Sequence, residues 1–320
     1  MLDVFFTFDI EIWCGGWNNI DSRFSSAFQQ YIYGTTQKGE FGLRYTAKQL
    51  QDHSLLGVFF TEPLFATRFG IEPLAEVIGI IRGHNQEVQL HMHPEWVDES
   101  RTPLLPRTHS KKQFMHDFSL EEQTILIAKG CELIEQAGGE KVNAFRAGSF
   151  GANRDTLRAV AANGLRFDSS YNASIFGKSN GIMAGQTLVE PTACDGVIEY
   201  PMTVFDDGTG SLRHAQLGAC SMREMEGLLW QALESGRKSF VILSHNFELL
   251  NPALNQVDNV MVKRFQDLCR FFDNHRDCFR LRGFHDLVSA PLTTQPAPLR
   301  SSFWKTGHRM VEQLMRRRYR

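Results

Sequence analysis

Residues 1–13 read MLDVFFTFDIEIW, an apolar run that carries two carboxylates, Asp9 and Glu11, near its end. Such a run is typical of a strand buried on both faces, as in a parallel sheet covered by helices. Because strand side chains alternate, Asp9 and Glu11 share one face. Their mutual repulsion has to be relieved by a cation or a proton, so the pair predicts a metal ligand beside a general base. The alternative is an acidic strand end that faces solvent.

Further short apolar runs alternate with helical patterns along the chain. We expect strands at 4–10, 57–61, 87–92, 144–146, 166–168, 196–200, 240–244 and 279–282, and helices at 43–55, 71–83, 119–138, 153–163, 221–236 and 257–275. About seven or eight such β/α units favour a closed barrel over an open sheet. The expected organisation is an α/β barrel over residues 1–290, a Pro/Thr/Gln-rich linker over 291–300 and a basic amphipathic tail over 301–320.

Residues 87–96 read EVQLHMHPEW and contain the clearest metal-binding pattern. His91 and His93 share one strand face, and Pro94 keeps His93 extended and ends the strand. Two imidazoles and a carboxylate that leave a coordination position open are typical of a catalytic zinc site. We therefore predict a divalent metal, zinc, on His91, His93 and Glu11. The alternative is a buried pair of hydrogen-bonded histidines.

Two further apolar strands end in a polar residue: Arg146 closes one and His245 closes the other. Active sites of β/α barrels are assembled at the C-terminal ends of several strands, so we expect these ends to converge with those of the first strand and of the histidine strand. Considered alone, Arg146 is more typical of a surface salt bridge, and His245 of a helix cap.

Several motifs resemble, in order, those of the polysaccharide deacetylases of the NodB-homology class, carbohydrate esterase family 4. They are TFDIE (7–11), GVFFTEP (57–63), HMHPEW (91–96), FRAGSFGAN (145–153), LRFDSSYN (165–172) and LSHN (243–246). The resemblance covers about residues 1–290 and identifies a divergent member. It implies a distorted (β/α)7 barrel, which agrees with the strand pattern.

The resemblance also implies roles for individual residues. Asp9 corresponds to the catalytic base, Glu11 to a metal ligand, and Arg146 to the group that keeps Asp9 ionised and oriented. His245 corresponds to the general acid, and Leu243 to a wall of the pocket for the acetyl methyl group. The implied activity is metal-dependent removal of N-acetyl groups from a polysaccharide, or from its lipid-linked or oligosaccharide precursor, as in exopolysaccharide biosynthesis.

Two departures from the family pattern leave alternatives open. The family spaces its histidines four apart, but here Glu95 stands four residues after His91, so the metal set is His91 with either His93 or Glu95. The Arg-x-Pro-x-Gly motif reads RAGSFG and lacks its proline. Two other functions therefore stay open: hydrolysis of another non-peptide C–N bond in a small substrate, and non-catalytic glycan binding.

Residues 12–42 are long, aromatic and polar, and loops of this length are usually functional or disordered. Sugars present apolar faces that stack on aromatic rings, so we expect a substrate lid. Trp13, Trp17 and Trp96 are the candidate substrate contacts because they closely follow motif residues. The alternative is a small satellite core beneath the loop.

Composition limits the partners and the location. The net charge of −2 carries no nucleic-acid signature, and the six cysteines form no CxxC pair. The start of the chain lacks the basic region of a secretory signal, so we expect a cytoplasmic protein with an acetylated glycan as its partner. The tail over 301–320 combines basic and apolar residues, which suits peripheral contact with an anionic membrane. Packing of a tail helix on the barrel is the alternative.

Overall fold

The computed structural model describes residues 1–106, 110–175, 180–183, 185–289 and 291–302. Its largest element is a nine-stranded sheet with the order β12-β1-β4-β5-β6-β7-β9-β8, in which β13 also pairs with β1. Every pairing in it is parallel except that of β8 with β9. The strands are β1 (Leu2–Ile10), β4 (Val58–Thr61), β5 (Glu87–Met92), β6 (Ala144–Ala147), β7 (Phe167–Asp168), β8 (Thr192–Cys194), β9 (Val197–Glu199), β12 (Ser239–His245) and β13 (Phe279–Leu281).

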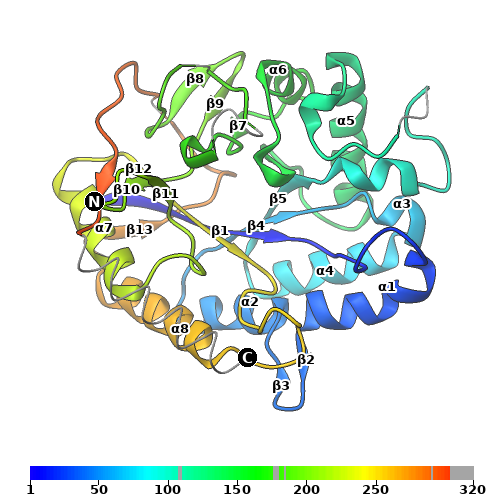
Figure 1. Ribbon diagram of the computed structural model, residues 1–320, viewed down its shortest axis with the longest axis horizontal. Helices are drawn as coiled ribbons and strands as arrows, with labels where there is room; N and C mark the ends of the chain where they lie inside the picture. The colour runs from blue at the N-terminus through cyan, green and yellow to red at the C-terminus, as the bar shows by residue number, and fades with distance from the viewer. Residues whose placement is uncertain (107–109, 176–179, 184, 290, 303–320) are drawn as a thin grey trace.

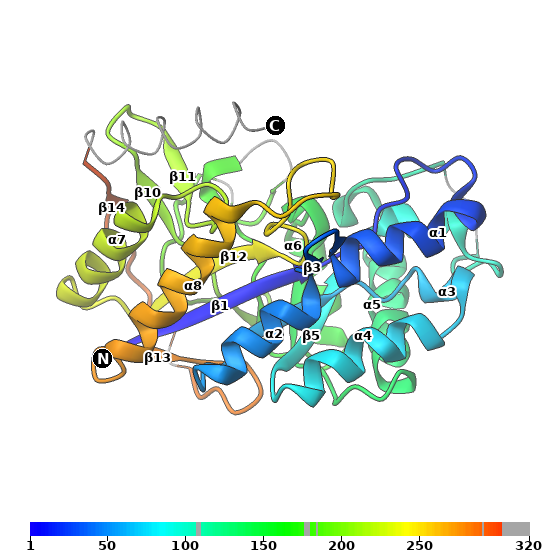
Figure 2. The same ribbon diagram turned by 90° about the horizontal axis from the view of Figure 1, so that it is seen from below.

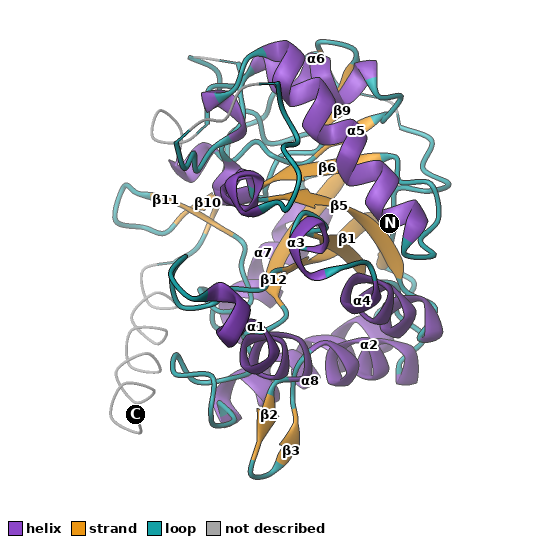
Figure 3. Cartoon of the chain, turned by 90° about the vertical axis from the view of Figure 1, so that its right-hand side faces the viewer, coloured by secondary structure: helices purple, strands orange, loops and turns teal. Residues whose placement is uncertain are grey.

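The sheet curls around its inner face and forms a distorted barrel (Figure 3). Within the described part of the chain, no strand ladder joins β12 to β9 or β8. The gap is bridged by irregular backbone instead: the Leu217 N–H donates to the Leu243 carbonyl, and the Leu243 N–H to the Ala215 carbonyl, each over 2.9 Å. The expected β/α barrel is confirmed, with one irregular wall.

Helices cover the outside of the sheet (Figures 1 and 2). They are α1 (Ile20–Phe28), α2 (Leu43–Asp52), α3 (Ala66–Phe69), α4 (Glu72–Gly83), α5 (Leu120–Gln136), α6 (Arg154–Ala162), α7 (Met222–Glu234) and α8 (Asn259–Asn274). Capping explains several of their starts: Ser119 accepts the Glu122 N–H while the Glu122 carboxylate accepts the Ser119 N–H, and the same exchange joins Ser221 to Glu224. The six helices expected from the sequence are α2, α4, α5, α6, α7 and α8.

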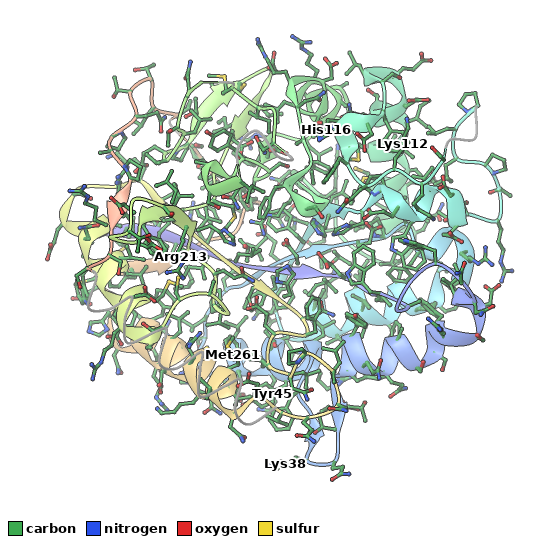
Figure 4. The ribbon with its side chains drawn as sticks, in the orientation of Figure 1. Lys38, Tyr45, Lys112, His116, Arg213 and Met261 are labelled. Atoms are coloured by element: carbon green, nitrogen blue, oxygen red, sulfur yellow. The ribbon has the colours of Figure 1, made fainter. Side chains whose placement is uncertain are left out.

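Alternate residues of β1, β4 and β12 enter two different cores. On β1, Phe6 and Phe8 face the helices, whereas Phe5 faces the barrel interior and packs against Phe284 with ring centroids 4.9 Å apart. Side chains fill the space between sheet and helices (Figure 4). Because both strand faces are buried, the strands read as continuous apolar runs in the sequence.

The segment 12–42 is not the long loop that we expected. It contains α1, a π-helical turn (Gln29–Tyr33) and the hairpin of β2 (Thr35–Thr36) and β3 (Gly39–Glu40). Lys38 stands at the tip of this hairpin (Figure 4). Phe24 of α1 is buried and stacks on Phe69, with ring centroids 3.7 Å apart. Phe24 and Phe28 belong to the same buried core as the outer face of the strands, and not to a separate satellite core. The helical spacing of Ile20, Phe24, Ala27 and Phe28 is typical of α1.

A small second sheet joins β11, β10 and β14, which are Leu212–His214, Val204–Asp206 and Leu299–Arg300. The segment over 291–300 is anchored, because the Gln295 side chain accepts the Val189 and Glu190 N–H groups. Apart from Ser301 and Ser302, the predicted tail over 301–320 lies outside the described residues. None of the helices in the described ranges has the length and apolar character needed to cross a membrane.

Candidate functional site

The inner face of the barrel changes from apolar to polar at the C-terminal ends of the strands. Strand register brings these ends together, since Asp9 pairs with His245 across β1 and β12, and His91 with Arg146 across β5 and β6. A cavity of about 350 Å³ opens at this end of the barrel. The predicted site residues that line it are Asp9, Glu11, Trp13, His93, Leu243 and His245.

Three predicted metal ligands meet at a single carboxylate oxygen. Glu11 Oε1 lies 3.2 Å from His91 Nε2 and 2.9 Å from His93 Nε2, and all three side chains are buried. Burial favours a neutral Glu11, but the charge of His93 and the hydrogen bonds from both histidines outweigh it and hold the pKa of Glu11 well below its usual value. Burial likewise opposes the charged form of His93, while Glu11 and Glu95 raise its pKa well above the usual value.

These donors have the chemistry of a divalent metal site. His91 Nδ1 donates to the Arg146 carbonyl over 2.8 Å, and this bond orients the ring so that Nε2 faces Glu11 Oε1. An oxygen and two nitrogens then converge within 4.8 Å of one another. Two imidazoles with one carboxylate are a recognised ligand set for zinc, so the residues present fit the predicted metal.

Two backbone features hold His93 in place. Its N–H donates to the buried carboxylate of Glu62, whose other oxygen accepts the Leu64 N–H over 2.5 Å. Gly148 lies against the imidazole, since a Cβ at that position would stand 2.6 Å from His93 Nδ1. A side chain at this position, such as the proline of the Arg-x-Pro-x-Gly motif that the segment resembles, would collide with the His93 ring.

Glu95, the alternative ligand, lies on the other side of the His93 ring. Its Oε2 is 3.4 Å from His93 Nδ1, whereas His93 Nε2 faces Glu11. Glu95 is therefore placed to orient the imidazole and lies outside the converging donor atoms of Glu11, His91 and His93.

Asp9 is fixed by Arg146 in the interior of the barrel. Arg146 Nη1 donates to Asp9 Oδ1 over 2.6 Å and to Thr7 Oγ1 over 2.9 Å, and its other nitrogens bind the Ser169 carbonyl and hydroxyl. The guanidinium also lies 4.2 Å from the centre of the Phe60 ring. The second carboxylate oxygen, Asp9 Oδ2, faces the metal-ligand candidates and lies 3.9 Å from His91 Nε2.

His245 lies at the end of β12, and its ring contacts the carboxylate of Glu248. Its Nδ1 donates to Glu248 Oε1 over 3.2 Å, and one ring nitrogen lies within 4.8 Å of oxygens of Asp9 and Glu11. Burial acts to lower the pKa of His245, but Glu248, Glu11 and Asp9 together raise it to about 9.

A solved structure shows the same architecture. The chain aligns with the crystal structure of a protein from Mycobacterium smegmatis assigned as a polysaccharide deacetylase, with a TM-score of 0.57 and 15% identity over 92% of this chain and 94% of the other. The chain has the polysaccharide deacetylase fold. The expected distorted (β/α)7 barrel of the NodB-homology class is thereby confirmed.

Weaker similarities exist to a family 4 carbohydrate esterase from Streptomyces lividans and to a peptidoglycan deacetylase from Bacillus subtilis. The first has a TM-score of 0.42 and 13% identity over 87% of this chain and 90% of the other. The second has a TM-score of 0.40 and 10% identity over 99% and 96%. The fold assignment rests on the mycobacterial structure alone. No model of a known protein family matches the sequence, and no curated protein matches it.

The four predicted substrate contacts occupy different places in this deacetylase fold. Trp13 and Leu243 line the cavity, on the side of Glu11 and on β12 respectively. Trp17 does not line the cavity; its ring contacts Trp13, with centroids 6.0 Å apart, and Trp96, with centroids 5.0 Å apart. Trp96 is buried and does not line the cavity.

Several residues of the site were missed by the sequence analysis. Ser149, Phe150, His214 and Gln216 line the cavity, and both Ser149 and Phe150 have a positive φ, which is uncommon outside glycine and often marks functional sites. Glu248 was also missed, although its spacing of three from His245 could have indicated it. His214 and Gln216 lie on the irregular wall, where no local pattern identifies inward positions.

Proposed function

We propose that this protein is a metal-dependent hydrolase that removes N-acetyl groups from a polysaccharide, or from its lipid-linked or oligosaccharide precursor. The observation that carries the proposal is the arrangement of two overlapping sets of groups around Glu11. One set, with His91 and His93, suits a metal; the other, with Asp9 and His245, suits a base and an acid. Glu11, His93, Asp9 and His245 all line one cavity, and His91 lies buried beside it.

In this proposal Glu11, His91 and His93 hold the metal, with zinc as the preferred ion. When bound, the metal supplies a Lewis acid that polarises the acyl carbonyl and lowers the pKa of water. Glu95 lies against His93 Nδ1, and the Arg146 carbonyl accepts from His91 Nδ1, so each contacts the ring nitrogen that does not face Glu11. Such supporting groups fix the orientation of metal ligands.

Asp9 is the proposed general base. Its Oδ1 accepts a hydrogen bond from Arg146, and its Oδ2 is directed toward His91. The free oxygen can therefore accept the proton of an attacking water beside the metal ligands. Arg146 is buried and also bonded to Thr7 and Ser169, so it cannot follow a movement of Asp9. Rotation of the Asp9 carboxylate would therefore break its hydrogen bond with Arg146.

His245 is the proposed general acid. Since Nδ1 is bonded to Glu248, the proton for the departing amine comes from Nε2. Leu243 precedes it by two residues on the same strand face and forms an apolar wall of the cavity. That wall suits an acetyl methyl group, and the polar groups beside it suit the reacting amide.

Acetate release from a panel of N-acetylated and O-acetylated glycans, measured with zinc-reconstituted protein, tests the function. We expect release from an N-acetylated glycan, and an Asp9→Asn variant that retains zinc but turns over about 10²–10⁴ times more slowly. Equal turnover by the variant would remove Asp9 from the role of base.

Two other outcomes support the competing functions. Hydrolysis of small amides or ureides without any acetate release from glycans favours the other C–N hydrolase. Glycan binding with no turnover, by protein that takes up no metal, favours a non-catalytic glycan-binding protein.

A further inference from the structure

The two oxygens of Glu11 have different partners. Oε1 faces the Nε2 atoms of His91 and His93, whereas Oε2 accepts a hydrogen bond from the indole N–H of Trp13 over 2.8 Å. Trp13 follows Glu11 by two residues in the irregular segment after β1, and the hydrogen bond between them shows that both side chains lie on the same side of the backbone.

The indole of Trp13 is held on two sides. Its ring meets the His93 imidazole edge to face, with centroids 4.7 Å apart and planes at 85°. On its other side it meets Trp17 at 6.0 Å and 82°. Trp17 is itself fixed by Trp96 and by Lys111, whose Nζ lies 4.0 Å from the Trp17 ring centre. The Trp13 N–H therefore cannot turn away from Glu11 without displacing these neighbours.

We infer that Trp13 is a positioning residue for the metal ligand Glu11, and this inference rests on the metal set of the proposed function. The indole N–H engages Oε2 and directs Oε1 alone at the metal, so that Glu11 binds through one oxygen. Because Oε2 accepts the only polar hydrogen of the Trp13 side chain, that hydrogen is not available to a substrate hydroxyl. The contribution of Trp13 to the substrate cavity is then its ring surface.

Zinc affinity, measured by competition with a chromogenic chelator, tests this role without any catalytic assay. Trp13→Phe keeps an aromatic ring but lacks the N–H, and we expect its zinc dissociation constant to rise about 10-fold to 100-fold. Trp230→Phe is the matched control, with the same change in a tryptophan that packs against Phe271 and Phe279, and should remain within about twofold of the wild type. Equal zinc affinity of Trp13→Phe and the wild type, or an equal loss in both variants, would overturn the inference.

A second measurement uses the wild-type protein, in case Trp13→Phe fails to fold. In protein labelled with ¹⁵N at its indole nitrogens, we expect one N–H resonance shifted downfield by its carboxylate partner and changed more than the others by Co²⁺. Absence of such a resonance in the metal-free protein overturns the inference. Acetate release is independent of both readouts: metal binding that depends on Trp13 without deacetylation contradicts the proposed function alone, and deacetylation with a zinc affinity independent of Trp13 contradicts only this inference.

Discussion

Arg146 Nη1 donates a hydrogen bond to Asp9 Oδ1 over 2.6 Å between two strands that are not neighbours in the sheet. Both side chains are buried, and the guanidinium has further partners in Thr7 and Ser169. The pair joins β1, which carries Asp9, to β6, which carries Arg146. It fixes one oxygen of Asp9 and leaves the other toward the metal ligands.

Removing the arginine should strongly destabilise the fold. Arg146→Ala leaves Asp9 as a buried charge without its partner, so we expect the free energy of unfolding in urea to fall by about 3–5 kcal/mol. The control is Arg154→Ala, which removes an exposed arginine from Asp195 while Arg158 still pairs with that carboxylate, and it should cost about 1 kcal/mol or less. Similar losses in the two variants would show that the Arg146–Asp9 pair contributes no more to the free energy of unfolding than the Arg154–Asp195 pair.

Metal analysis of single variants separates the two possible ligand sets. Glu11→Ala and His93→Ala should lose near-stoichiometric zinc, because their donor atoms converge with His91. Glu95→Ala should keep zinc with an affinity about 10-fold lower, since Glu95 contacts only the far nitrogen of His93. Elemental mass spectrometry after dialysis measures the zinc. Loss in Glu95→Ala together with retention in His93→Ala would reverse the assignment.

A side chain at position 148 should disturb the metal site. Gly148→Ala places a Cβ against the His93 ring, so the imidazole has to leave its present position beside Glu11. We expect weaker zinc binding, by about 10-fold or more, in the chelator competition assay. Gly79→Ala in α4 is the control, because a Cβ there meets nothing within 4 Å. Unchanged affinity in Gly148→Ala would mean that His93 tolerates the shift or is not a ligand.

Glu248 should affect turnover without affecting the metal. Glu248→Gln removes the negative charge beside His245 Nδ1, and we expect kcat to fall about 10-fold to 100-fold while zinc content is unchanged. Glu234→Gln, at an exposed position of α7, serves as the control. A rise in KM with constant kcat would assign Glu248 to substrate binding instead of to positioning the acid.

A buried carboxyl pair should make stability depend on pH. Asp168 and Glu199 are register partners on β7 and β9, and burial together with the proximity of Asp168 raises the pKa of Glu199 well above 4.5. Burial also raises the pKa of Asp168. The folded state thus holds a proton that the unfolded state has released, so the free energy of unfolding should fall as pH rises from about 5 to about 8.

Glu199→Gln tests this dependence. The amide keeps an oxygen for the Tyr171 N–H but has no proton to lose, so the decrease in unfolding free energy between about pH 5 and about pH 8 should become smaller. Urea denaturation at several pH values measures it, with Glu234→Gln as the exposed control. The same slope in Glu199→Gln and the wild type would exclude the pair as its source.

The strands and most helices could be predicted from the sequence because their causes are local. The strands of the barrel are buried on both faces, so their apolar runs are continuous, and side chains such as Ser119 mark where helices begin. Helix α1 was missed because its four apolar residues stand among polar and aromatic ones in a segment that resembles a loop. The spacing of Asp9 from Glu11 and of His91 from His93 already placed each pair on one strand face.

Only the tertiary structure decided which of these groups meet. Strand register set Asp9 beside His245, and the close approach of Gly148 to the His93 ring linked two departures from the family motifs that seemed unrelated in the sequence. The sequence by itself determined the barrel and its polar strand ends, since these follow from alternation along one strand. Glu11 faces one nitrogen of the His93 ring and Glu95 faces the other. This arrangement depends on ring orientation and on packing between distant segments, which no local pattern encodes.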